Sequence, residues 1–155
     1  NGDVLKPGDV QKMTAGSGII HSEFNPSDKE PVHFLQIWII PNMLDLRPSY
    51  EQKAFNRKSM TNRLTLLVSP DGHNGSLEIH QDAEIWQILL EENKDTEFAI
   101  NHSRKIWIQV AEGSVSTNEH LLVAGDGLAV SDEEDIIRLR GIDKLSNIII
   151  FNLRA

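Results

Sequence analysis

Short apolar runs separated by turn-forming residues make up most of the chain. Glycine, proline, asparagine and aspartate punctuate it, for example at Pro7-Gly8-Asp9, Asp71-Gly72 and Glu112-Gly113. No long segment repeats apolar residues at i, i+3, i+4 and i+7, the spacing that would indicate a helix. The pattern predicts an all-β protein, a sandwich or barrel, with strands over 32–40, 64–68, 77–89, 105–110 and 147–153.

An internal repeat relates the two ends of the sequence. When Gly8-Asp9 is set against Gly125-Asp126, the same offset places Ile19-Ile20 on Ile136-Ile137 without a gap. His21 then falls on Arg138, and Glu23 falls on Arg140. The repeat predicts two similar β-units joined by a polar linker within residues 47–62.

Composition changes this picture mainly by exclusion. The 155 residues carry a net charge of −8, which argues against a nucleic-acid binder because phosphate contacts need clustered lysine and arginine. The chain has no cysteine, so disulfides and thiolate-ligated metals are excluded. No apolar run reaches the roughly 18 residues that a membrane span needs. A cysteine-free chain without a visible signal peptide is compatible with a reducing compartment, and we expect a cytoplasmic protein.

The segment GSGIIHSEFN, residues 16–25, carries candidate metal chemistry. Side chains alternate between the two faces of a strand, so His21 and Glu23 would point the same way and Ser22 the opposite way. An imidazole and a carboxylate suit iron, manganese, nickel, copper or zinc. On spacing alone, however, a His-x-Glu pair is more often a surface or edge pair, and two ligands are not a complete site.

A second polar cluster, His80, Asp82 and Glu84, alternates along another predicted strand. It is open to two interpretations, a second metal site or a solvated strand face. Arg138 and Arg140 are its expected neighbours, and arginine has no lone pair to offer a metal, so salt bridges are favoured. Three tryptophans lie in apolar patterns and are expected in the core rather than in a substrate pocket: Trp38, Trp86 and Trp107.

Longer motifs surround the His-x-Glu pair: PGDVQKMTAGSGIIHSEFN is followed by HFLQIWIIP. These motifs resemble the N-terminal cupin of the pirin family, a group of two-cupin β-barrel proteins that includes bacterial quercetinase-like members. The similarity continues through RPSYEQKAF, SPDGHNGSLEIHQDAEIW, RKIWIQVAEGSV and AGDGLAVSDEE. It implies a jelly-roll architecture in which residues 1–50 are the remainder of a metal-binding N-terminal cupin. Residues 51–155 would be a C-terminal cupin that lacks metal ligands.

The resemblance also implies a ligand set. In pirins, two histidines of an H-x-H segment and the His and Glu of an H-S-E segment hold the metal, and His21 and Glu23 match the second pair. The H-x-H pair is expected on a strand upstream of Asn1. Asn1-Gly2 is itself a favoured hairpin turn, which indicates that the chain starts between two strands of the first cupin. A mononuclear divalent metal is implied, iron first, with an incomplete ligand set in this chain.

The function implied by the resemblance is quercetin 2,3-dioxygenase-type ring opening, with O₂ and a flavonol as substrates. Glu23 would be both a metal ligand and the general base for the substrate hydroxyl. The 155 residues alone are expected to be inactive. A different class of function is also implied, because some pirins are non-enzymatic, redox-sensitive protein partners of transcription factors. An open edge in the first barrel further predicts self-association through the N-terminal region.

Overall fold

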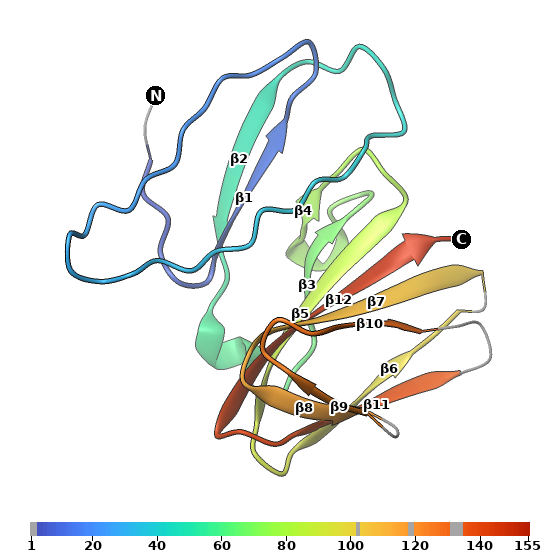
Figure 1. Cartoon of the computed structure of the whole chain (residues 1–155). Helices are drawn as coiled ribbons and strands as arrows, with labels where there is room; N and C mark the ends of the chain where they lie inside the picture. The colour runs from blue at the N-terminus through green and yellow to red at the C-terminus, as the bar shows by residue number, and fades with distance from the viewer. Residues whose placement is uncertain (1–2, 102, 118–119, 131–134) are drawn as a thin grey trace.

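Two packed antiparallel sheets form the larger part of the molecule (Figure 1). The computed structural model describes residues 3–101, 103–117, 120–130 and 135–155, so the predicted turn at Asn1-Gly2 lies outside the described residues. The larger sheet has the order β10-β7-β12-β5-β3-β4 and the smaller one β6-β11-β8-β9. The predicted all-β class is therefore confirmed.

The strands of the larger sheet, in chain order, are β3 (Thr65–Ser69), β4 (Leu77–Glu78), β5 (Ala83–Glu91), β7 (Arg104–Glu112), β10 (Gly127–Val130) and β12 (Leu145–Arg154). The smaller sheet contains β6 (Asp95–Ala99), β8 (Ser114–Thr117), β9 (His120–Val123) and β11 (Ile136–Gly141). Neighbouring strands in both sheets run antiparallel, apart from the parallel pair β3 and β4.

The part of the larger sheet formed by β3, β5 and β12 is covered on both faces, which explains the nearly continuous apolar runs of these strands. On the inner face, Ile88, Ile108 and Ile150 pack against the smaller sheet and are completely buried. On the outer face, a second cluster includes Leu77 and Leu89. The N-terminal part of the chain packs against this second cluster through Val10, Ile39 and Phe55.

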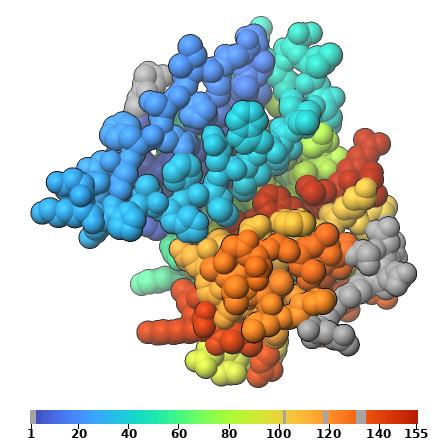
Figure 2. All heavy atoms as spheres, viewed as in Figure 1, coloured from blue at the N-terminus to red at the C-terminus, as the bar shows by residue number. Residues whose placement is uncertain are grey.

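The N-terminal part consists of a two-stranded ribbon and a long coil. Strands β1 (Asp9–Thr14) and β2 (Ser49–Ala54) pair in antiparallel register. Between them, residues 15–48 form no strand or helix and spread over the surface as the blue-to-cyan segment in Figure 2. We call residues 15–48 the arm. Two short 3₁₀ helices, η1 (Arg57–Met60) and η2 (His73–Gly75), lie further along the chain.

The repeat seen in the sequence coincides with the same turn built twice. Gly8 has φ 99° and Gly125 has φ 96°. The backbone N–H of Asp9 donates to the Lys6 carbonyl at 2.8 Å, and that of Asp126 donates to the Val123 carbonyl at 2.9 Å. In both turns the aspartate Oδ2 accepts a hydrogen bond from the N–H three residues back. β1 follows the first turn, and β10 follows the second.

The strand predictions are confirmed in the C-terminal part and wrong in the arm. The strands predicted over 64–68, 105–110 and 147–153 correspond to β3, β7 and β12, whereas the prediction over 77–89 is divided between β4 and β5. No strand forms over 32–40, because none of the described strands lies beside it to exchange backbone hydrogen bonds. The segment predicted as a polar linker, 47–62, instead contains β2 and η1. Among the described residues, no helix is long and apolar enough to cross a membrane.

Candidate functional site

The His21–Glu23 segment lies in the arm, just after a tight turn. Gly18 donates its N–H to the Ala15 carbonyl at 2.8 Å, and Gly16 has φ 51°. A Cβ on Gly16 would overlap the Leu46 carbonyl oxygen, so only glycine allows the two ends of the arm to meet here. The arm is therefore a loop with its ends held together, and the segment begins where the loop leaves the ribbon.

Glu23 is connected to the ribbon by hydrogen bonds. Gln11 on β1 donates from Nε2 to Glu23 Oε1. The Tyr50 hydroxyl on β2 donates to Gln52 Oε1 at 2.7 Å and lies 3.5 Å from Gln11 Oε1. Gln52 in turn donates to Asp9 Oδ2 at 3.1 Å. The carboxylate thus belongs to a polar row along the ribbon.

The same row changes the acidity of Tyr50. Its pKa is raised above the ordinary value of 10.0, first by partial burial of the phenol and then by the negative charges of Asp3, Asp9 and Glu23. Each of these carboxylates disfavours a phenolate nearby. The electrostatics of the segment are therefore those of an acidic surface that keeps its tyrosine neutral.

His21 and Glu23 do not share a strand face, because no strand forms between residues 15 and 48. Both side chains are exposed, and His21 makes no hydrogen bond within the described residues. No three His, Asp or Glu side chains of the described part come close enough to hold a metal ion together. The donor types suit a metal, but two donors do not complete its coordination. Their assignment as ligands stays a prediction.

Arg138 and Arg140, the repeat positions of His21 and Glu23, lie on the outward face of β11. Arg138 Nε is 2.9 Å from Glu97 Oε1, and Arg140 Nη1 is 3.5 Å from Asp95 Oδ2, both across the β6–β11 pairing. The inward positions are apolar: Ile137 and Leu139 are each 1% exposed. Neither face of this strand carries a group that would bind a metal.

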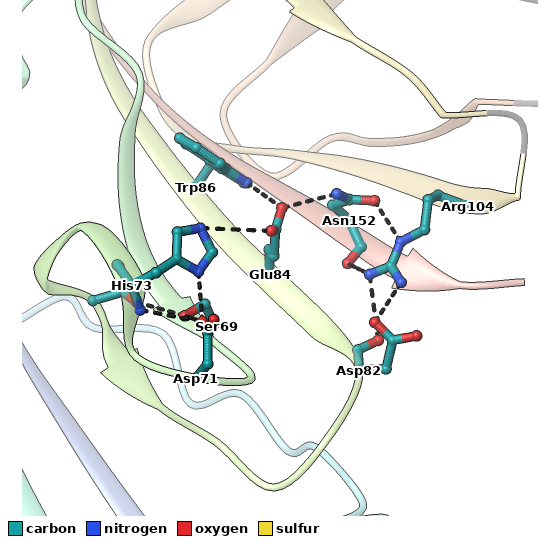
Figure 3. A network of polar contacts seen from close by, with 9 residues as sticks. Ser69, Asp71, His73, Asp82, Glu84, Trp86, Arg104 and Asn152 are labelled. Carbon is teal, nitrogen blue, oxygen red and sulfur yellow. Dashed lines mark hydrogen bonds and ion pairs between the residues drawn. The ribbon is translucent and has the colours of Figure 1, made fainter.

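The predicted ion pairs between this arginine pair and the acidic cluster at 80–84 are therefore wrong. Asp82 instead pairs with Arg104 on β7, as Figure 3 shows. Arg104 Nε also donates to Asn152 Oδ1 at 3.0 Å, and Asn152 Nδ2 donates to Glu84 Oε2 at 2.9 Å. This network could not be predicted from the sequence, because its residues come together only through the pairing of β12 with β5 and β7.

The other half of the network in Figure 3 holds the turn after β3. His73 Nδ1 lies 2.6 Å from Asp71 Oδ1, and His73 Nε2 lies 4.0 Å from Glu84 Oε1. The hydrogen bond from His73 lowers the pKa of Asp71. Ser69 is fully buried and donates to Asp71, not to His73, so the trio lacks an activated nucleophile. We call the contacts among Ser69, Asp71 and His73 the clamp, because they hold the turn after β3 in place.

The three tryptophans have different environments. Trp86 packs edge-on against Phe98 with ring centroids 6.0 Å apart, which confirms its predicted place in the core. Trp38 in the arm is 86% exposed, so its core assignment is wrong. Trp107 is 40% exposed on the outer face of β7, so its core assignment is wrong as well. The outward position of Trp107 follows from its buried neighbours Ile106 and Ile108 on the same strand.

Two family models match the chain. Residues 66–153 match the model described as the quercetinase C-terminal cupin domain, and residues 1–39 match the model described as pirin. The first match covers the two packed sheets from β3 to β12. The second covers β1 and most of the arm, including His21 and Glu23.

Individual relatives agree with these matches. Quercetin 2,3-dioxygenase of Escherichia coli K12 is 38% identical over 153 residues, which are 99% of this chain and 64% of that protein. A putative quercetin 2,3-dioxygenase of Pasteurella multocida is 36% identical over 151 residues, 96% of this chain and 63% of that protein. The chain therefore spans a little under two thirds of the length of these relatives.

Solved structures show the same architecture. The bacterial pirin YhhW from Escherichia coli, solved in complex with nickel(II), superposes with a TM-score of 0.84 at 37% identity, over 95% of this chain and 62% of that one. GK1651 from Geobacillus kaustophilus gives a TM-score of 0.73 at 22% identity, over 97% of this chain and 65% of that one. Together with the family models, these similarities show that the chain belongs to the pirin family and has its cupin fold.

Proposed function

We propose that a pirin chain containing these 155 residues is a metal-dependent dioxygenase of the quercetin 2,3-dioxygenase type, with O₂ and a flavonol as substrates. The observation that carries the proposal is 38% identity to the Escherichia coli quercetin 2,3-dioxygenase over 99% of this chain. His21 and Glu23 lie within the part that matches the pirin model. The nickel bound by the Escherichia coli pirin supports a divalent metal, among which iron is our first expectation.

His21 and Glu23 are proposed as metal ligands, with Glu23 also as the general base. One Glu23 oxygen accepts a hydrogen bond from Gln11, and the other, Oε2, has no partner in the described part of the chain. A free carboxylate oxygen could take the proton of a substrate hydroxyl. Iron oxygenases need three or four protein ligands, so two donors do not suffice. We therefore propose that residues 1–155 on their own do not turn over a flavonol.

A chimera tests the positive part of the proposal. This chain would replace the matched 153 residues of the Escherichia coli enzyme, and O₂ uptake with quercetin would be measured together with bound metal. We expect turnover by the chimera and a loss of at least about 100-fold, together with a loss of metal, on His21→Ala or Glu23→Gln. His33→Ala, which changes another exposed arm histidine, is the matched control and should retain activity.

The 155-residue protein tests the negative part. We expect no O₂ uptake above the buffer rate and less than one bound metal per chain, measured beside the complete Escherichia coli enzyme. Turnover by the 155 residues would overturn their proposed inactivity. A folded, metal-loaded chimera that consumes no O₂ with any flavonol would overturn the dioxygenase proposal itself.

The arm favours a second candidate, a non-enzymatic, redox-sensitive role as a protein partner of transcription factors. Ile20 is 104% exposed, Leu44 is 90% exposed and Trp38 is 86% exposed, and extended apolar surface of this kind marks protein contacts. The acidic net charge suits a protein partner better than DNA. Metal-dependent binding by an inactive chimera would select this role. A cytoplasmic location fits either role and stays a prediction.

A further inference from the structure

A groove of about 330 Å³, open to solvent, lies between the arm and the outer face of the larger sheet. Its roof is the arm segment Leu35, Gln36 and Ile37. Its floor is formed by Trp107 and Gln109 on β7 and by Phe151 and Leu153 on β12. Neither His21 nor Glu23 lines it, so it is separate from the candidate metal ligands.

The strand register explains why the floor is aromatic. Trp107 pairs with Phe151 of β12 on one side and with Ala129 of β10 on the other. Two aromatic side chains therefore project from neighbouring positions on the outer face of the sheet. On the β10 side, the residues beneath and beside the indole ring are small, Gly127 and Ala129.

Trp107 is also fixed in position before any ligand arrives. Its ring lies against Gly127, where any side chain would overlap it. Its Nε1 donates to Gln109 Oε1 at 3.3 Å. The Gln109 amide in turn donates to the carbonyls of Gly125 at 3.1 Å and Asp126 at 2.9 Å. A ring held in this way gives up little conformational entropy when a ligand stacks on it.

The chemistry of the lining selects the class of ligand. None of the seven lining residues is charged, which disfavours an ion. The Gln36 amide has no hydrogen-bond partner among the described residues and could bond a hydroxyl or carbonyl. An enclosed apolar cavity of about 150 Å³ holds benzene, so an open groove of about twice that volume has room for one face of a two-ring molecule.

We propose that this groove binds a neutral, planar aromatic molecule of about two rings carrying a hydroxyl or carbonyl group. Trp107 and Phe151 provide the stacking surface, and Gln36 provides the polar contact. The proposal does not rest on dioxygenase activity, because no metal and no reaction step enter it. It gives the junction between the arm and the larger sheet a binding role separate from the candidate metal ligands.

Fluorine NMR can test the site directly. The chain has three tryptophans, so the 155-residue protein labelled with 5-fluorotryptophan gives three signals. The probe is 2-naphthol, which is neutral at pH 7, added in the presence of a metal chelator. We expect a saturable shift of the Trp107 signal, which Trp107→Phe identifies, and no shift for the core residue Trp86.

A matched pair of arm variants tests the location. Ile37→Arg places a charge in the roof and should weaken 2-naphthol binding at least tenfold. Ile40→Arg makes the same change three residues further along the arm, outside the lining, and should leave the affinity within twofold. Both side chains are partly or largely exposed, so both variants should fold.

Three results would overturn the proposal. The first is an unchanged Trp107 signal at saturating 2-naphthol. The second is equal affinity in the two arginine variants. The third is a non-saturating shift of the Trp38 signal alongside that of Trp107, which would mean that the probe adsorbs on the exposed apolar arm.

Discussion

At the scale of single residues, the hydrogen bond between Gln11 and Glu23 gives the candidate ligand a fixed neighbour. It connects a carboxylate in the arm to a strand twelve residues earlier in the chain. Tyr50 then joins the same row from the opposite strand. Because the row is polar and partly exposed, the free energy of each contact is small. A measurement on this polar row can therefore show whether Glu23 lies beside the ribbon.

Because Tyr50 is the single tyrosine of the chain, its pKa can be measured without interference from other phenols. Tyr50 should titrate at higher pH than a free phenol, because partial burial and nearby carboxylates disfavour the phenolate. Ultraviolet absorbance during a pH titration follows this one group. Glu23→Gln removes one of the negative charges and should bring the pKa closer to 10.0.

His21→Gln is the control for this titration, because His21 does not contribute to the raised pKa of Tyr50. Its titration curve should coincide with that of the unchanged protein. If Glu23→Gln also leaves the curve in place, Glu23 does not lie beside the ribbon in solution.

Two glycines with the same φ allow the cost of backbone strain to be measured separately from the cost of steric overlap. Gly75 and Gly113 both have φ 75°. A Cβ on Gly113 would lie 2.8 Å from the Leu145 carbonyl and 2.7 Å from Ser146 Oγ, whereas at Gly75 only Lys53 Nζ, at the end of a long side chain, comes near, at 3.4 Å. Gly75→Ala should cost about 1 kcal/mol for the left-handed angle. Gly113→Ala should cost about 3 kcal/mol, because overpacking adds to it.

Urea denaturation of both alanine variants measures the difference. Equal losses of unfolding free energy would show that the turn between β7 and β8 relaxes to accept a side chain. A larger loss at Gly75 would contradict the described packing altogether.

The residue types of the candidate site could be found from the sequence, but their arrangement could not. The motif around His21 and Glu23 identifies the family because it is a continuous stretch of chain. Gln11 and Tyr50 carry no such signal, since they reach Glu23 only through the pairing of β1 with β2. The spacing of His21 and Glu23 was interpreted as a strand face, and that step failed because the segment is coil.

At the scale of elements, two segments of similar composition have different fates. Residues 147–153 lie in β12, between β5 and β7, and exchange backbone hydrogen bonds with both. Residues 32–40 have no such neighbours in the described part. They are held by isolated contacts, such as the Gln81 amide donating to the Ile40 carbonyl at 2.8 Å. Strand formation depends on the neighbours as much as on the residues, and a local pattern does not reveal neighbours.

The turn between β3 and β4 should respond to acid through Asp71. Hydrogen bonds from the His73 side chain and backbone N–H favour the carboxylate and hold its pKa below the ordinary 3.8. A group with a lowered folded-state pKa stabilises the fold above its unfolded-state pKa, and that contribution is lost as the pH falls through the folded-state value. Asp71→Asn should therefore destabilise the protein at pH 7 and have progressively less effect below 3.8.

Urea melts of the two proteins across this pH range check the prediction. Asp143→Asn is the matched control, because the Asp143 side chain has no hydrogen bond or ion pair in the described part of the chain. Its effect should be small and should not follow the same pH course. If Asp71→Asn lowered the unfolding free energy equally from pH 7 down to acid, the stabilisation would not depend on the charged carboxylate.

At the scale of the whole molecule, the chain divides into a well-packed region around the centre of the larger sheet and an open region at the arm. The core clusters account for the fold from η1 to β12, and the regular apolar pattern there made it predictable. The arm covers part of the outer face while leaving most of its own apolar side chains in contact with water. Only the three-dimensional arrangement reveals this imbalance, because the apolar pattern of the arm is that of buried strands.

The open region predicts self-association. Among the described strands β1 pairs only with β2, so its other edge has free backbone groups, and the exposed apolar side chains of the arm lie nearby. We expect concentration-dependent oligomers in sedimentation velocity. The net charge of −8 opposes contact between copies, so added salt should screen the repulsion and strengthen association.

Trp38→Glu with Leu44→Glu should weaken association, whereas Leu121→Glu, at an exposed position on β9, should not. A protein that stays monomeric at high concentration and high salt would show that the arm covers its apolar side chains in solution.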